Sequence, residues 1–147
     1  MMMKKAMSLL ACLLMAAASL CAQTDKIVGN YKVVRNGVSS KVRVYKHNGG
    51  YRAQVTWVDN LKKEDGSLRT DEKNPDKTKR SVRADQIVLI DKVTYDSKEN
   101  AWTNGKIYDP TSGKTYKVKL WFDSDKVLKM RGYIGPFHDT SEWTKVD

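Results

Sequence analysis

The string Ser112-Gly113-Lys114-Thr115 is the part of the sequence closest to a phosphate-binding loop. Such a loop requires a glycine five residues before Gly113 and a helix directly after the threonine. Tyr108 occupies that position, and the residues after Thr115 alternate between polar and apolar, as in a strand. The stretch therefore predicts a hairpin turn in which Asp109 begins the bend, Pro110 fixes one φ angle and Gly113 takes the left-handed position.

No set of residues in the sequence has a spacing suitable for metal binding or for acid–base catalysis. His47 falls in a predicted turn and His138 in a loop, and neither belongs to an HxH or HExxH motif. The acidic segment 71–76 lacks the alternating oxygen ligands and the glycine of a calcium loop, and no Gly-x-Ser-x-Gly elbow is present. The sequence thus predicts no catalytic residue, no metal site and no cofactor, and favours a protein that is not an enzyme.

Aromatic side chains are the remaining candidates for binding chemistry. The chain has four tryptophans and seven tyrosines, spread over the predicted strands. They would either fill the interior of a sheet protein or line a ligand cavity within it. Stacking on single-stranded nucleic acid also uses aromatics beside lysines, but the export signal described next argues against a nucleic-acid partner.

The first 22 residues have the features of a secretory signal peptide. Lys4 and Lys5 precede a stretch without charge that ends in small residues, and cleavage is expected between Ala22 and Gln23. Residues 23–147 then form a single exported domain, in the periplasm or at the outer envelope, with no transmembrane span. Secretion, or lipid attachment at Cys21, is the alternative. Both cysteines of the chain lie in the removed segment, so no disulfide is predicted.

Downstream of the signal, the hydrophobic period is two. It places Val42 and Val44 on one face of a strand, and Val55 and Trp57 on one face of the next, with the tight-turn sequence His47–Gly50 between them. Further alternating stretches cover 86–95, 114–122 and 127–135, and a short last strand holds Trp143. Seven or eight short strands at hairpin spacing predict a barrel or a sandwich.

One long segment, 59–85, interrupts this pattern. It contains eight basic and seven acidic side chains and almost no large apolar residue. A polar tract of this kind is typical of a solvated flap, although long loops also carry binding functions. The formal charge is +10, and removal of the signal lowers it to +8. A basic surface on the exported domain would either contact an anionic envelope surface or serve only to keep the protein soluble.

Four motifs occur in a familiar order: DEKNPD at 71–76, GKIYDPTSGKTY at 105–116, RGYIG at 131–135 and WTKV at 143–146. Together they resemble the bacterial exported proteins of the domain of unknown function 2147 family. The resemblance implies an all-β fold: an antiparallel up-and-down β-barrel of about eight strands, lipocalin-like or calycin-type, with one long charged loop. The family has no established function.

The resemblance also implies a structural latch at the closed end of the barrel. Lipocalin-type barrels begin with Gly-x-Trp and place a basic side chain of the last strand over that ring. Here Gly29 and Tyr31 correspond to the first element, and Lys145 beside Trp143 to the second. Family members usually have Trp and Arg at the positions of Tyr31 and Lys145, so the stacking is expected to be weaker here.

Two functional hypotheses follow. In the first, a non-enzymatic barrel binds a small apolar or amphipathic ligand. Its candidate contacts are Trp57, Trp102, Lys106, Tyr108, Arg131 and Tyr133. In the second, the barrel is filled, and loop 59–85 contacts a partner protein or an anionic envelope surface. No oligomeric state is predicted.

Overall fold

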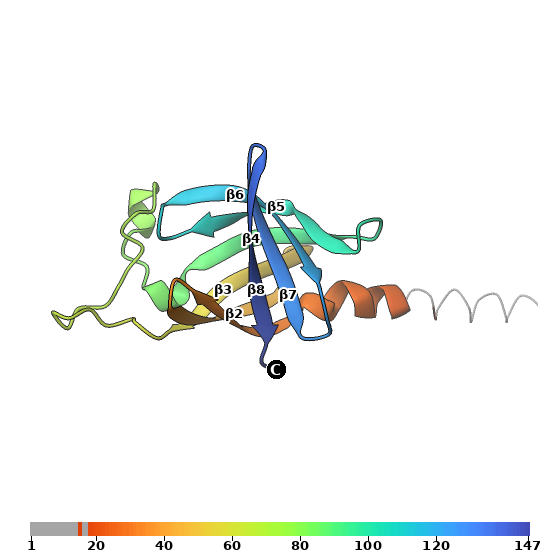
Figure 1. The fold of residues 1–147 in the computed structure, drawn as a ribbon, viewed down its shortest axis with the longest axis horizontal. Helices are drawn as coiled ribbons and strands as arrows, with labels where there is room; N and C mark the ends of the chain where they lie inside the picture. The colour runs from red at the N-terminus through yellow and green to blue at the C-terminus, as the bar shows by residue number, and fades with distance from the viewer. Residues whose placement is uncertain (1–14, 16–17) are drawn as a thin grey trace, which may run out of the picture.

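The computed structural model describes residues 15 and 18–147 (Figure 1). Eight strands follow one another along the chain, with three short 3-10 helices between or before them. The helices are η1 (Asp25–Ile27), η2 (Lys77–Lys79) and η3 (Ala84–Gln86). The strands are β1 (Gly29–Arg35), β2 (Val38–His47), β3 (Gly50–Val58), β4 (Val88–Asp96), β5 (Ala101–Asp109), β6 (Lys114–Phe122), β7 (Val127–Ile134) and β8 (Phe137–Lys145).

The strands form a closed antiparallel barrel in chain order. Closure is made by β1 and β8, where Tyr31 lies opposite Lys145 and Val33 opposite Trp143. Every other pair of neighbours is joined by a single connection, so the topology is up-and-down. The predicted barrel of about eight strands is confirmed, and the sandwich alternative is excluded because closure leaves no free sheet edge.

Local sequence explains the two tight hairpins at the start of the barrel. Asn36-Gly37 joins β1 to β2 and Asn48-Gly49 joins β2 to β3, and all four residues have positive φ angles between 48° and 78°. Asparagine and glycine adopt this left-handed conformation at low cost, which two-residue hairpins require. His47 was expected in the second turn, but it is the last residue of β2.

The strand predictions are accurate where one face is buried and fail at the end of the chain. β6 has the predicted bounds, and β7 differs by one residue. β8 is longer than expected and includes His138, which was assigned to a loop. The first four residues of β8 are exposed, so they show no alternation of apolar and polar residues.

The N-terminal helix η1 closes one end of the barrel. The Trp102 indole N–H donates to the Thr24 carbonyl at 3.0 Å, and the Tyr31 hydroxyl donates to the Ile27 carbonyl at 2.7 Å. The Tyr51 hydroxyl donates to the Asp25 carboxylate at 2.5 Å. Three buried aromatic side chains are thus satisfied by the backbone and one carboxylate of the plug, as buried polar groups require.

The four residues expected to form the latch lie together beside this plug. Lys145 Nζ donates to the Lys26 carbonyl at 2.9 Å and lies 5.8 Å from the Phe122 ring. A Cβ on Gly29 would lie 2.8 Å from Lys145 Cε, so the glycine makes room for the lysine. The ring beneath Lys145 is therefore Phe122. Tyr31, which was expected there, packs against Trp143 at a centroid distance of 6.2 Å.

Loop 59–85 is largely exposed, as expected for a solvated flap, and it is fastened to the barrel at a few points. Asp71 is only 3% exposed and accepts a hydrogen bond from the Tyr108 hydroxyl at 2.6 Å. Lys73 Nζ donates to the Thr111 carbonyl at 2.8 Å, and the Lys73 carbonyl would lie 2.2 Å from a Cβ on Gly113. Composition predicts the exposure of this segment, but it does not reveal the few specific polar contacts that attach it to the barrel.

The predicted signal peptide lies largely outside the described residues, and both its presence and its cleavage remain predictions. Residues 18–24 are helical and lead into η1. In the described part of the chain, no helix has the length and apolar character that a membrane crossing needs.

Candidate ligand cavity

A cavity of about 440 Å³ occupies the half of the barrel opposite the plug. Its walls come from the strand ends near the β1–β2, β5–β6 and β7–β8 hairpins and from the segment that leads into β4. The apolar wall residues are Val33, Val38, Val42, Val55, Val58, Ala84, Ile87, Leu89, Ile107, Met130, Ile134 and Phe137. This size lies within the range of small-molecule sites, about 300–1,000 Å³.

Gly132 explains why this half of the barrel is not filled. The inward-facing positions of β7 are Leu128, Met130 and Gly132, so the side chain is missing where the cavity lies. A Cβ at Gly132 would make only ordinary contacts, at 3.6 Å from Tyr116 Cβ and 3.8 Å from Ile107 Cγ2. The glycine is therefore not required by a clash or by its backbone conformation, and its effect is to leave space.

Two polar atoms in the cavity wall lack partners. Among the residues described, Ser141 Oγ and Trp143 Nε1 are the buried side-chain nitrogen and oxygen atoms without a hydrogen bond. Both residues belong to β8 and line the cavity. Most buried polar groups are paired, so these two are unusual. Neither atom is open to the cavity, because no water-sized group can reach it.

Charged residues lie at the rim of the cavity. Arg35 and Asp139 form an ion pair at 3.6 Å, with the Arg35 side chain 49% exposed. Asp109 accepts hydrogen bonds from Thr111 and Ser112. Burial opposes ionisation of Asp109, but these hydrogen bonds outweigh it and hold the pKa of the carboxyl below its usual range. Asp109 is therefore an anion that is already satisfied within its own turn.

Tyr108 connects the cavity wall to loop 59–85. It lines the cavity, and its hydroxyl donates to Asp71 at 2.6 Å. Burial and the neighbouring carboxylate raise the pKa of this tyrosine. The phenol is therefore a protonated donor at neutral pH, and its hydrogen bond joins the loop to the cavity wall.

The chain matches the model of a family described as an uncharacterized protein conserved in bacteria, DUF2147, over residues 29–145. The chain belongs to the DUF2147 family. Among solved structures, it is similar to protein HP1028 from the human pathogen Helicobacter pylori, which is described as belonging to the lipocalin family. The TM-score is 0.65 and the identity 26%, with 82% of this chain and 83% of that one covered. Comparison with curated proteins gives no match.

Two of the motifs that carry the resemblance to DUF2147 meet in space. Segment 71–76 lies against segment 105–116 through the Asp71–Tyr108 and Lys73–Thr111 hydrogen bonds. Within the second motif, Asp109, Pro110 and Gly113 form the β5–β6 turn as expected from turn chemistry. Gly105, the first residue of this motif, lies within β5, where a Cβ would come 2.1 Å from the Lys92 carbonyl of β4.

Of the six residues expected to contact a ligand in this DUF2147 barrel, Tyr108 lines the cavity and the other five lie elsewhere. Trp102 is buried beside the plug at the opposite end. Lys106 is exposed on the outer face of β5, Arg131 lies over the Trp121 ring, and Tyr133 packs against His138.

Trp57 shows how a single irregularity changes which face a residue occupies. The alternation in β3 placed Trp57 on the same face as Val55. However, the register with β2 shifts between Lys41 and Val42, which leaves Thr56 as an extra residue. A bulge of this kind turns the following side chain to the other face. Trp57 is 43% exposed, with Lys41 Nζ 5.5 Å from its ring on the outside of the barrel.

Gly132 and Ser141 were not among the predicted site residues, and Trp143 was expected only in the latch. The alternation of β7 was available as a signal, because it put Gly132 at an inward position among large apolar residues. No comparable signal existed for Ser141, since it follows an exposed polar run. Trp143 serves in both places, because its ring packs against Tyr31 and the residue also lines the cavity.

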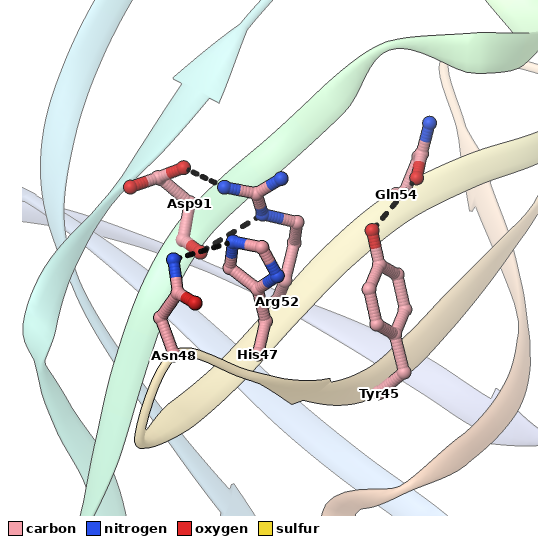
Figure 2. Close-up of polar contacts among 6 residues, drawn as sticks. All are labelled: Tyr45, His47, Asn48, Arg52, Gln54 and Asp91. Carbon is pink, nitrogen blue, oxygen red and sulfur yellow. Dashed lines mark hydrogen bonds and ion pairs between the residues drawn. The ribbon is translucent and has the colours of Figure 1, made fainter.

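The outer surface carries polar contacts that serve the sheet. Figure 2 shows Tyr45 donating to Gln54 at 2.9 Å, Arg52 bound to Asp91, and His47 beside Asn48. These contacts join β2, β3 and β4 on their outer faces. Within the described part of the chain, no three His, Cys, Asp or Glu side chains gather in an arrangement that could hold a metal ion.

Proposed function

We propose that this DUF2147 protein binds a small apolar or amphipathic molecule inside its barrel and is not an enzyme. The observation that carries the proposal is the largely apolar cavity of about 440 Å³, located where Gly132 omits a side chain. Sites for small molecules are generally concave, mostly apolar and supplied with a few polar groups. Arg35 and Asp139 at the rim are such polar groups.

The arrangement of the barrel supports binding over catalysis. One end is sealed by η1, and the cavity lies at the other end beneath the rim of Arg35 and Asp139. A site that admits a ligand from one side and holds it among apolar walls suits storage or transport. The N-terminal segment supports export, so we place this activity in the cell envelope.

Filling the cavity tests the proposal. In Gly132→Phe, the new ring would occupy the cavity without backbone strain, since a Cβ fits at this position. The matched control is Val34→Phe, because Val34 is 58% exposed and does not line the cavity. Both proteins would be purified from the source cell and examined by native mass spectrometry. Binding of an apolar fluorescent probe would be measured in parallel.

The wild type and Val34→Phe are expected to carry a co-purifying small molecule and to bind the probe. Gly132→Phe is expected to lose both while its thermal unfolding stays cooperative. Equal probe binding by Gly132→Phe and the control would show that the molecule binds elsewhere and would refute the proposal.

A second candidate function is contact with an anionic membrane surface, and the β7–β8 hairpin favours it over loop 59–85. This hairpin projects beyond the rest of the barrel (Figure 1), and its tip exposes Ile134 by 58% and Phe137 by 75%. An exposed lysine pair, Lys106 opposite Lys117, lies on the outer face of the adjoining strands. Apolar tips flanked by basic side chains are typical of interfacial membrane binding.

Sedimentation with lipid vesicles tests this candidate. The wild type is expected to bind vesicles with anionic lipid and not purely zwitterionic ones, and Phe137→Ser is expected to weaken the binding. Leu68→Ser is the matched control, since Leu68 is 41% exposed on loop 59–85. If Leu68→Ser loses more vesicle binding than Phe137→Ser, the membrane contact lies on loop 59–85 and not on the hairpin.

A further inference from the structure

We infer that the ligand enters and leaves the cavity directly from a lipid bilayer with anionic headgroups, at the side of the mouth between β1 and the β7–β8 hairpin. The inference rests on the proposed function and names the source of the ligand, which is a membrane and not the aqueous phase. It starts from two apolar side chains, Ile134 and Phe137, that line the cavity and are nevertheless exposed.

These two side chains continue the inner face of the barrel to the tip of the hairpin. Alternation along β7 places Ile134 on the same face as Gly132, and alternation along β8 places Phe137 on the same face as Ser141. Both are exposed because the hairpin projects beyond its neighbours, and β7 pairs with β6 only as far as Tyr133 (Figure 1). The apolar wall of the cavity is therefore continuous with an exposed apolar tip.

The seam that closes the barrel is short on this side of the cavity. β1 and β8 pair only from Tyr31 opposite Lys145 to Val33 opposite Trp143. Beyond this point, no residue in the described part of β1 pairs with residues 137–142 of β8. The two strands are joined there by the ion pair between Arg35 and Asp139 at 3.6 Å. They can separate at the mouth without loss of a backbone hydrogen bond between them.

Charge complementarity identifies an anionic bilayer as the partner of the tip. Lys106 lies opposite Lys117, and Lys117 lies opposite Tyr133 next to the tip. Like charges in opposite positions destabilise a sheet, and the ion pairs found among the described residues include neither lysine. Anionic headgroups supply the missing counter-charge, while the acyl region covers the apolar tip.

This arrangement has a kinetic consequence. A ligand that passes from the cavity to a bilayer in contact with the mouth moves at a rate set by collisions between protein and vesicle. That rate rises with vesicle concentration. A ligand that first dissociates into water moves at a rate set by its dissociation, which does not depend on the vesicles.

Stopped-flow transfer of N-phenylnaphthylamine, an uncharged fluorescent probe, tests the inference on the protein purified from the source cell. The loaded protein is mixed with vesicles that carry a quencher lipid, with and without anionic lipid, and the readout is the slope of the transfer rate against vesicle concentration. Phe137→Ser removes the apolar tip, and Lys117→Glu reverses one of the basic side chains.

Both variants have matched controls at the plugged end of the barrel. Val146→Ser removes an exposed apolar side chain that follows β8 beside the plug. Lys98→Glu makes the same charge change in the exposed β4–β5 turn, where the neighbouring Asn100 accepts a hydrogen bond from Gln23.

For the wild type, a 10-fold increase in anionic vesicles is expected to raise the transfer rate about 10-fold, as in an encounter-limited process. About 0.5 M salt should reduce the slope, because it screens the headgroups. Phe137→Ser should lower the slope about 10-fold, since one large apolar side chain no longer enters the bilayer. Lys117→Glu should lower it about 3- to 10-fold. Both controls should keep the wild-type slope.

The slope separates membrane contact from a change in the cavity. A weaker cavity alters the transfer rate equally at every vesicle concentration, whereas a lost contact removes the dependence on concentration. Gel filtration of the free protein adds a second readout. A dimer that dissociates in Phe137→Ser would assign the tip to a second copy of the chain and overturn the inference.

Failure of the inference can be told apart from failure of the proposed function. Probe binding with a transfer rate independent of vesicle concentration, or with equal slopes in the tip variants and their controls, overturns the inference alone. Absence of both probe binding and a co-purifying molecule in the wild type overturns the proposed function together with the inference.

Discussion

The bond between Tyr108 and Asp71 should hold loop 59–85 against the barrel, and Tyr108→Phe tests this with the removal of one oxygen atom. The ring that lines the cavity is retained, while Asp71, at 3% exposed, loses a charge-assisted hydrogen bond of 2.6 Å. Hydrogen bonds to charged groups contribute about 1.5–3 kcal/mol. We therefore expect Tyr108→Phe to lower the free energy that favours the attached over the detached state of the loop by about 2 kcal/mol.

A loss of this size has two measurable consequences. If the loop detaches alone, its open population rises about 30-fold, since about 1.4 kcal/mol corresponds to a factor of ten. Trypsin cleavage within the loop, which carries eight lysines and arginines, should accelerate by the same factor when opening is fast. If the loop and barrel unfold together, the melting temperature should fall by about 6–10 °C.

Tyr45→Phe is the matched control for this experiment. The Tyr45 hydroxyl donates to Gln54 at 2.9 Å on the outside of the barrel, a bond between neutral groups that includes no residue of the loop (Figure 2). Its loop cleavage should equal that of the wild type. Gly113→Ala should disrupt the contact between the β5–β6 turn and the loop, because its Cβ would come 2.2 Å from the Lys73 carbonyl. Unchanged cleavage in both Tyr108→Phe and Gly113→Ala would refute the attachment.

Two further predictions concern single positions. Gly105→Ala should destabilise the domain by about 3 kcal/mol or more, because its Cβ would lie 2.1 Å from the Lys92 carbonyl. Gly132→Ala should instead stabilise the domain by about 0.5–1 kcal/mol, because its Cβ makes only ordinary contacts. Urea titration should show changes of opposite sign in the free energy of unfolding, and equal changes would contradict the contact geometry. Hydrogen bonds from Lys46 and a neighbouring tyrosine lower the pKa of Asp25. The ionised Asp25 carboxylate therefore stabilises the fold above pH about 4, and this contribution is lost as the pH falls through the lowered pKa. Asp25→Asn should remove this part of the pH dependence of the free energy of unfolding. The change should be less than about 1 kcal/mol, because the ion pair between Asp25 and Lys46 is exposed. An unchanged stability profile at acid pH would contradict a role for Asp25.

The fold was predictable because its determinants are local. Alternation of period two along 114–122 gives the bounds of β6, and Asn-Gly pairs at 36–37 and 48–49 mark the tight hairpins. Barrel closure was not predictable from these patterns alone, because a sandwich of the same strands would show the same alternation. The resemblance to DUF2147 supplied that choice, and the pairing of β1 with β8 confirms it.

The candidate site was less predictable, because its residues are selected by register and by missing side chains. A one-residue bulge at Thr56 sends Trp57 outward, and no feature of the local sequence distinguishes it from regular alternation. Counting aromatics also pointed to Trp102, which fills the plugged end. A cavity arises where side chains are small, so Gly132 was a better marker than any tryptophan.

These observations give the glycines of the chain two distinct roles. Gly105 and Gly113 are required because another backbone passes within 2.2 Å of where a Cβ would be, so they allow β4 and loop 59–85 to pack closely. Gly132 is free of such contacts, and an alanine there would improve the strand while reducing the cavity. A position where folding alone would favour a larger residue therefore keeps the cavity open, as the proposed ligand binding requires.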